Sequence, residues 1–246
     1  MAEVALVTGA SRGIGRAIAL RLAEDGLRVA VHYTRQREAA ESVAEAIGAR
    51  CVGVFQAELT EPEGRTSLWR AVSGVASVTT LVNNAGIYEP QAFAETTLAD
   101  LRASLARTFE LNFVAPFELT QLAVADWRRS GTAGKVLNVA SRVGFRGEPG
   151  AAIYAASKAA LINLTRSLAV ELAPEIGVFG IAPGWVETAM ARDGMGDRLP
   201  SILATLPMGR MATPEDCANA ASFLLRAESS YLSGVTLDIN GASYFH

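Results

Sequence analysis

The sequence predicts a single doubly wound α/β domain over residues 1–246, with a seven-stranded, mainly parallel sheet and helices on both faces. Three observations predict this fold. Short apolar runs alternate with longer segments of helical periodicity along the whole chain. A glycine-rich turn follows the first apolar run. No linker, repeat or change of composition divides the chain, and 50% of its residues are hydrophobic, which is enough to bury a sizeable core.

Short apolar runs rich in β-branched residues predict the strands, because strands buried on both faces read as continuous apolar segments. The predicted strands are Glu3–Thr8, Arg28–Tyr33, Cys51–Gln56, Val78–Asn83, Lys135–Ala140, Val178–Ala182 and Val235–Ile239.

Apolar residues at helical spacing predict the helices, several of which end at Gly or begin at Pro. The predicted helices are Ile14–Asp25, Arg37–Ile47, Pro62–Val75, Leu98–Arg129, Ala151–Ala173 and Pro214–Arg226. Pro116 lies inside the longest of them and predicts a kink there. The segment Thr188–Gly209 mixes Gly and Pro with apolar residues, so we expect a mobile lid over the substrate at about 186–210.

The composition excludes several classes of protein. A net charge of −3 leaves no basic stripe for a nucleic acid, and no apolar run is long enough to cross a membrane. The first residues contain no signal-peptide pattern, and the two cysteines are isolated, so we expect a cytoplasmic protein. The only histidines are His32 and His246, which argues against His-ligated metals and Ser–His catalysis. We expect no metal.

The turn after the first strand, Thr8–Gly15, carries Gly9, Gly13 and Gly15 in the spacing G-x3-G-x-G. Glycines at this place allow a tight turn and let the backbone approach a pyrophosphate at the N-terminus of a helix. The pattern therefore indicates a dinucleotide site. The alternative is an ordinary tight turn between a strand and a helix.

The end of the second strand distinguishes the two nicotinamide cofactors. NAD-binding folds usually carry an acidic residue here for the ribose 2′-hydroxyl, but this chain has no acid between Gly26 and Glu38. It has Arg35 and Arg37 instead, and Arg12 in the glycine turn, and guanidinium groups suit a 2′-phosphate. We expect NADPH, read by Arg12 with Arg35. The alternative is that the arginines after this strand are merely solvated.

Four further groups of residues follow strands or lie on helices. Asn83–Gly86 follows the fourth strand and can line the adenosine side of a cofactor, or form a simple turn. Tyr154 and Lys158 are one helical turn apart, so the ammonium can lower the pKa of the phenol and make it an acid–base group. Ser141 follows the fifth strand. Its hydroxyl can donate a hydrogen bond to the substrate carbonyl oxygen that Tyr154 would protonate. Asn112 is a polar residue in an apolar helix, and bonding to the backbone is its alternative role.

Together these residues resemble the short-chain dehydrogenase/reductase family, over nearly the whole chain and in the family's order. Within the family, the chain is most similar to the 3-oxoacyl-(acyl-carrier-protein) reductase group. The resemblance implies a Rossmann domain and a catalytic set of Asn112, Ser141, Tyr154 and Lys158. Tyr154 would be the acid–base group, Lys158 would hold the ribose hydroxyls, Ser141 would orient the carbonyl, and Asn112 would position a water.

The resemblance also implies a cofactor site and an assembly. Val186 and Thr188 would contact the nicotinamide carboxamide, and Glu58 takes the place of the family's usual Asp near the adenine. A homotetramer would form through the two long helices. The motifs and the resemblance together predict a cofactor site of Gly9, Ser11, Arg12, Gly13, Ile14, Gly15, Tyr33, Thr34, Arg35, Glu58, Leu59, Asn84, Ala85, Gly86, Tyr154, Lys158, Pro183, Gly184, Val186 and Thr188.

The segments 142–148 and 185–209 are expected to choose the substrate. Phe145, Trp185 and Met190 suggest an apolar wall, with a core position as the alternative for Trp185. Arg142 or Arg146 could receive a carboxylate or phosphate, or lie solvated on the surface.

Three functions fit the sequence. The first is NADPH-dependent reduction of a 3-oxoacyl thioester or related ketone, on a small molecule or one linked to CoA or a carrier protein. The second is an NADP-dependent alcohol dehydrogenase or general ketone reductase of a degradative route. The third is an idle NADPH-binding sensor.

Overall fold

Seven strands pair in parallel, in the order β3–β2–β1–β4–β5–β6–β7, in this computed structural model, which describes residues 3–195 and 198–246. This confirms the predicted doubly wound fold. The strands are β1 (Val4–Val7), β2 (Arg28–Tyr33), β3 (Cys51–Gln56), β4 (Thr80–Asn83), β5 (Gly134–Val139), β6 (Ile176–Pro183) and β7 (Thr236–Ile239). The order reverses between β2 and β4 on either side of β1, so the switch point of the sheet lies at the end of β1.

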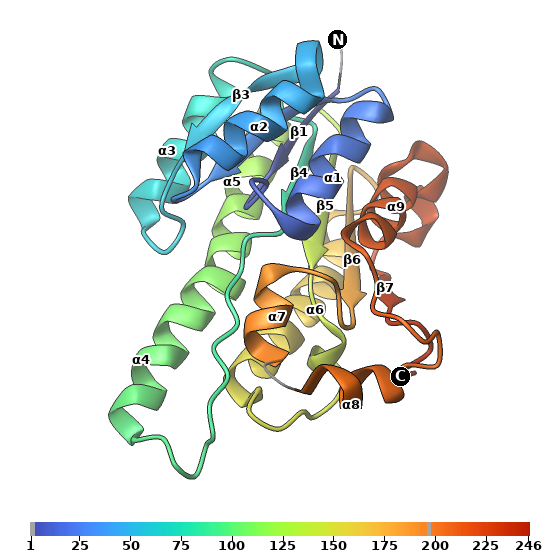
Figure 1. The fold of residues 1–246 in the computed structure, drawn as a ribbon. Coiled ribbons are helices and arrows are strands. Elements are labelled where there is room, and N and C mark those ends of the chain that lie inside the picture. The colour runs from blue at the N-terminus through green and yellow to red at the C-terminus, as the bar shows by residue number, and fades with distance from the viewer. Residues whose placement is uncertain (1–2, 196–197) are drawn as a thin grey trace.

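Helices cover both faces of the sheet (Figure 1). They are α1 (Gly13–Glu24), α2 (Arg37–Ile47), α3 (Pro62–Ser73), α4 (Leu98–Phe109), α5 (Ala115–Ser130), α6 (Ala152–Leu172), α7 (Ala189–Met195), α8 (Leu199–Ala204) and α9 (Pro214–Leu225). One hydrophobic core joins the sheet to α1, α2 and α9, and a second joins it to α3, α5 and α6. The buried strand β1 serves both cores, because successive side chains of a strand point to opposite faces.

The long helix predicted over Leu98–Arg129 is interrupted. A π-helical turn, Glu110–Val114, separates α4 from α5, and Pro116 lies in the first turn of α5. The interruption expected near Pro116 is therefore a π-helical turn that ends two residues before it. Proline is tolerated at the start of a helix because its missing N–H has no partner to lose there. The extra residue of the π turn carries the buried Asn112 toward the sheet edge.

A buried arginine fixes this π turn. Arg65 of α3 is 1% exposed, and its guanidinium donates to Glu110 Oε1 at 2.7 Å, to Glu118 Oε2 at 2.7 Å and to the carbonyl of Leu59 at 2.7 Å. A buried charge must be paired to be tolerated. The network therefore links α3, and the backbone at Leu59 after β3, to the π turn.

The segment expected to be a mobile lid contains two short helices, α7 and α8, which lie beyond the end of the sheet (Figure 1). They have a small core of their own, formed by Met195, Ile202, Leu206 and Met211. Burial of these apolar side chains explains why the segment is helical rather than irregular. Residues 196 and 197 of the predicted lid lie outside the described residues. Across the described ranges, the helices are too short or too polar to span a bilayer.

His32 links three strands at the switch point. It is fully buried in β2, its Nδ1 accepts from the N–H of Gly9 at 3.0 Å, and its Nε2 lies 3.2 Å from the carbonyl oxygen of Ala57. Because Nδ1 accepts, the ring proton sits on Nε2 and is donated to Ala57. Burial lowers the pKa of His32 to about 4, so the ring is neutral at pH 7.

This buried ring predicts an acid-dependent loss of stability. The folded protein disfavours the protonated ring, so the stabilisation is complete above pH 6.5 and is lost as the pH falls toward 4. Urea unfolding of the protein and of His32→Gln should show a stability difference that shrinks by about 2 to 3 kcal/mol between pH 7 and pH 4.5. The comparison with the variant cancels the titration of other groups. A difference that stays constant with pH would show that His32 is not held neutral.

Candidate active site

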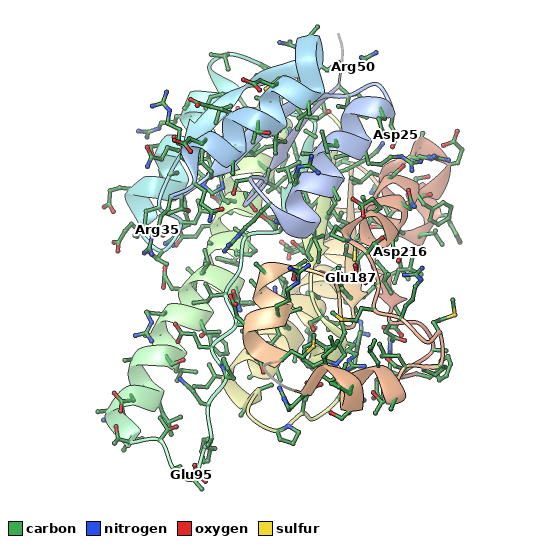
Figure 2. The ribbon with its side chains drawn as sticks, viewed as in Figure 1. Asp25, Arg35, Arg50, Glu95, Glu187 and Asp216 are labelled. Carbon is green, nitrogen blue, oxygen red and sulfur yellow. The ribbon has the colours of Figure 1, made fainter. Side chains whose placement is uncertain are left out.

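A cavity of about 1500 Å³ opens at the carboxyl edge of the sheet. Residues that follow β1, β2, β3, β4, β5 and β6 line it, as expected for ligand sites of parallel sheets. Figure 2 labels two of its lining residues from different parts of the edge, Arg35 after β2 and Glu187 after β6. Its volume exceeds that of an ordinary small-molecule pocket and leaves room for a cofactor and a substrate together.

Most of the predicted site residues meet in this cavity. Of the predicted set, the following line it: Gly9, Ser11, Arg12, Gly13, Ile14, Gly15, Tyr33, Thr34, Arg35, Glu58, Asn84, Ala85, Gly86, Ser141, Tyr154, Lys158, Pro183, Gly184, Val186 and Thr188. Leu59 and Asn112 are buried behind the wall. The Leu59 side chain packs in the core beside α3, so the prediction of a cofactor contact is not supported for that side chain.

The glycine turn is locked against the turn after β4. Gly9 and Gly13 have φ values of +62° and +54°, which favour glycine. A Cβ atom on Gly15 would overlap the Asn84 side chain and the Gly9 carbonyl. The Asn84 amide donates to the carbonyls of Thr8 and Gly9 at 2.8 and 3.1 Å, and Thr8 Oγ1 accepts from the Asn84 N–H at 2.9 Å. The packing therefore requires glycine at these positions.

This turn suits a phosphate group. It leads directly into α1, whose N-cap residue, Arg12, makes no capping hydrogen bond with its side chain. The first turn of α1 contains no acidic residue. The N–H groups at the start of α1 thus have no side-chain acceptor and face the cavity beside a cationic residue, which is the arrangement that binds anions at helix N-termini.

The arginines after β2 have separate roles. Arg35 lines the cavity, together with Arg12. Arg37 is exposed and pairs with Glu41 of its own helix at 2.7 Å, so the solvated alternative holds for Arg37. Glu58 also lines the cavity. Its carboxylate accepts hydrogen bonds from the N–H and the hydroxyl of Thr60.

Tyr154, Ser141 and Lys158 come together at one end of the cavity. Tyr154 and Lys158 lie on α6, and Ser141 follows β5 directly. The Ser141 hydroxyl lies near enough to the Tyr154 phenol to lower its pKa by hydrogen bonding, and Ser141 Oγ donates to the Pro183 carbonyl at 3.5 Å. Lys158 Nζ donates to the carbonyl of Val139 at 2.8 Å and lies 5.7 Å from the centre of the Tyr154 ring. A carbonyl oxygen placed between the two hydroxyls could accept from both.

Asn112 supports this group from behind. Its amide N–H groups donate to the Ile87 carbonyl at 3.0 Å and to Ser157 Oγ at 3.1 Å, and its oxygen accepts from the Ile87 N–H at 2.9 Å. These bonds show the backbone-bonding alternative for Asn112. A Cβ atom on Gly86 would lie 3.0 Å from Asn112 Oδ1 and 3.5 Å from Lys158 Nζ, so Gly86 separates the two side chains.

Burial dominates the electrostatics of the pair. It raises the pKa of Tyr154 to about 12, against a smaller lowering by the hydrogen bond from Ser141. It lowers the pKa of Lys158 to about 8. The expected lowering of the Tyr154 pKa by Lys158 is therefore wrong for the protein alone, because loss of water disfavours the charged form of both groups.

The substrate end of the cavity differs from expectation in several side chains. Trp185 and Met190 line the cavity, and Trp185 also packs on the small core of the lid. Phe145 instead stacks on His246, with ring centres 3.6 Å apart, so the prediction that it forms a pocket wall is wrong. Arg146 lies over the ring of Tyr244, away from the cavity lining.

Several lining residues escaped individual prediction or were placed wrongly, among them Tyr88, Arg142 and Glu148. Tyr88 packs edge-on against Tyr154, with ring centres 5.0 Å apart. Its place two residues after the Asn83–Gly86 motif is the sequence signal that marks it. Arg142 is 5% exposed rather than solvated and pairs with Glu148 at 3.3 Å. No local signal marks this pair. The described residues contain no cluster of His, Cys, Asp and Glu that could hold a metal ion.

Comparison with known proteins agrees with this geometry. The family model for short chain dehydrogenase matches residues 3–197. The 3-oxoacyl-[acyl-carrier-protein] reductases FabG of Staphylococcus aureus and Escherichia coli are 38% and 36% identical, over 99% and 98% of this chain and 99% and 97% of theirs.

Two solved structures, each with a TM-score of 0.88, are similar over 98% of this chain. One is a putative NAD(P) dependent gluconate 5-dehydrogenase from Beutenbergia cavernae with bound NADP, 34% identical and covered over 96% of its length. The other is a short chain dehydrogenase from Burkholderia cenocepacia in complex with NADP, 33% identical and covered over 97%. The chain belongs to the short-chain dehydrogenase family.

Proposed function

We propose that this oxidoreductase uses NADPH to reduce the carbonyl of a 3-oxoacyl thioester, or of a related ketone, to a hydroxyl, with Tyr154 as the general acid. The observation that carries the proposal is that Tyr154, Ser141 and Lys158 line the same cavity as the glycine turn. The names of the two reductases support the choice of substrate, and the bound NADP of the two structural neighbours supports the choice of cofactor.

The residues of the cavity fit NADPH. The uncapped start of α1 would hold the pyrophosphate, and Arg12 with Arg35 would hold the 2′-phosphate. Lys158 would hold the nicotinamide ribose, with Val186 and Thr188 at the carboxamide. Further contacts would come from the remaining lining residues of the predicted set. The bound cofactor would supply a hydride to the carbonyl carbon.

The protein's own groups would handle the oxygen of the carbonyl. Ser141 would donate a hydrogen bond that orients it, and Tyr154 would give it a proton. Because its pKa is raised, Tyr154 keeps its proton at neutral pH. Lys158, whose pKa is lowered to about 8, can pass a proton toward Tyr154 afterwards. The same residues would serve the oxidative alternative, because the group that protonates the oxygen in reduction takes the proton back in oxidation. Their presence together speaks against an idle sensor.

Replacement of Tyr154 tests its role as the general acid. Tyr154→Phe should lose at least about 100-fold in kcat for a 3-oxoacyl thioester, because it removes the donated proton. Its Kd for NADPH, measured by fluorescence, should stay near that of the wild type. Tyr88→Phe is the matched control, since it removes a hydroxyl from the ring packed on Tyr154. Activity of Tyr154→Phe close to that of the wild type would remove Tyr154 from the acid role.

Replacement of Arg35 tests the preference for NADPH over NADH. Arg35→Gln should weaken NADPH binding about 10- to 100-fold and leave NADH binding unchanged, because a charge-assisted bond to the 2′-phosphate is lost. Arg37→Gln is the control, because Arg37 is already paired with Glu41. Isothermal titration of the wild type and both variants with NADPH and with NADH gives the six dissociation constants. Equal wild-type affinity for NADH and NADPH would contradict the cofactor assignment.

The chain is also proposed to form a homotetramer through its long helices. Apolar side chains are exposed on both: Leu105 and Phe117 on α4 and α5 are 45% and 46% exposed, and Val170 on α6 is 85% exposed. Contact with further copies would remove this surface from water. A carrier-protein partner and a cytoplasmic location stay predictions from the sequence.

Light scattering at micromolar concentration tests this assembly. The expected mass is about four times 25.9 kDa. Val170→Glu should lower the mass, because it would bury a charge in the interface. Val75→Glu, at another exposed position after α3, should not. A monomeric wild type would refute the tetramer.

A further inference from the structure

We propose that the ion pair between Arg142 and Glu148 determines substrate specificity, admitting carbonyl compounds that are uncharged beside the reacting group and excluding those that carry a carboxylate there. The inference rests on the proposed function, since it describes the substrate of the same site. Both residues line the cavity, on the segment that joins Ser141 to α6.

The guanidinium of Arg142 is already committed to partners. Its side chain is 7% exposed, its Nη2 lies 3.3 Å from Glu148 Oε2, and its Nη1 donates to Ser243 Oγ at 2.7 Å. Its stem lies against Gly184, where a Cβ atom would be 3.5 Å from Arg142 Cδ. The arginine thus runs from Ser141 toward the C-terminal segment and is held there. A substrate carboxylate would have to displace one of these partners.

The carboxylate of Glu148 is a negative charge that lines the cavity beside Arg142. Glu148 is 14% exposed at its side chain and acts electrostatically on both tyrosines, Tyr154 and Tyr88, raising the pKa of each. Arg198 of the lid acts on Tyr88 in the opposite sense. Of the two cations at this end of the cavity, Arg142 is held by Glu148 and Ser243, and Lys158 donates to the Val139 carbonyl. A second carboxylate placed beside the carbonyl would therefore meet the like charge of Glu148 while the nearby cations are already engaged, which is costly.

The neutral ester linkage of a 3-oxo ester or thioester avoids this cost. A free 3-oxo acid, which is anionic at neutral pH, does not. The two compounds carry the same reacting ketone, so the ratio of their kcat/KM values isolates the effect of the charge. This ratio, ester over acid, is the quantity that the ion pair is proposed to set.

The experiment measures NADPH oxidation at pH 7.5 with a four-carbon 3-oxo acid and with its ethyl ester. The wild type should prefer the ester. Glu148→Gln removes the negative charge and leaves Arg142 unpaired, so the preference should fall about tenfold. Arg142→Gln leaves Glu148 unpaired, so the preference should rise. Opposite shifts in the two single variants are a result that a purely structural role would not give, since lost packing would slow both substrates alike.

Two further variants serve as controls for this experiment. The double variant Arg142→Gln with Glu148→Gln should return the preference toward that of the wild type, and it removes the problem of an unpaired buried charge. Glu215→Gln, a change of an exposed carboxylate that lines the same cavity, should leave the ratio unchanged within about twofold.

The outcomes separate the two proposals. Equal wild-type turnover of acid and ester, an unchanged ratio in Glu148→Gln, or shifts in the same direction in both single variants would overturn the role of the ion pair while leaving carbonyl reduction intact. If the wild type reduces neither compound nor any 3-oxoacyl thioester, the proposed function fails, and the inference falls with it.

Discussion

Parallel pairing of β1 with both β2 and β4 is the constraint on which the rest of the structure depends. Parallel strands need crossover helices, and these bring every strand end to the same edge of the sheet. The turn after β1 then meets the turn after β4 so closely that Gly15 has no room for a side chain against Asn84. His32, from β2, accepts from the same turn at Gly9. One pairing pattern thereby fixes the phosphate end of the cavity.

Burial disfavours the charged forms of side chains in and around the site. Loss of water raises the pKa of Tyr154 and lowers the pKa of Lys158 and His32, so all three lean toward their neutral forms in the protein alone. Arg65 and Arg142 are buried as well, and each is held by carboxylate partners. A single added or missing charge among these buried groups therefore has large consequences, both for a proton transfer and for the choice of substrate.

The π turn before α5 connects the scaffold to the chemistry. Arg65 holds Glu110 at its start, and Asn112 within it bonds the backbone of Ile87 and the hydroxyl of Ser157. The turn thereby links the segment after β4 to α6, on which Tyr154 and Lys158 lie. A mid-helix distortion of this kind often marks a functional position. Here it places a buried amide where a regular helix would have carried it to another face.

The sequence by itself determined the doubly wound fold, most strand and helix positions, and the members of the cavity that lie in local motifs. Such motifs are readable because the spacing of Tyr154 and Lys158, or of the glycines after β1, is set by one turn of chain. Only the tertiary structure decided which side chains are buried together. Phe145 meets His246 and Arg142 meets Ser243, which is 101 residues away. No local pattern records such contacts, because packing between distant elements creates them and the accompanying loss of water sets the pKa values.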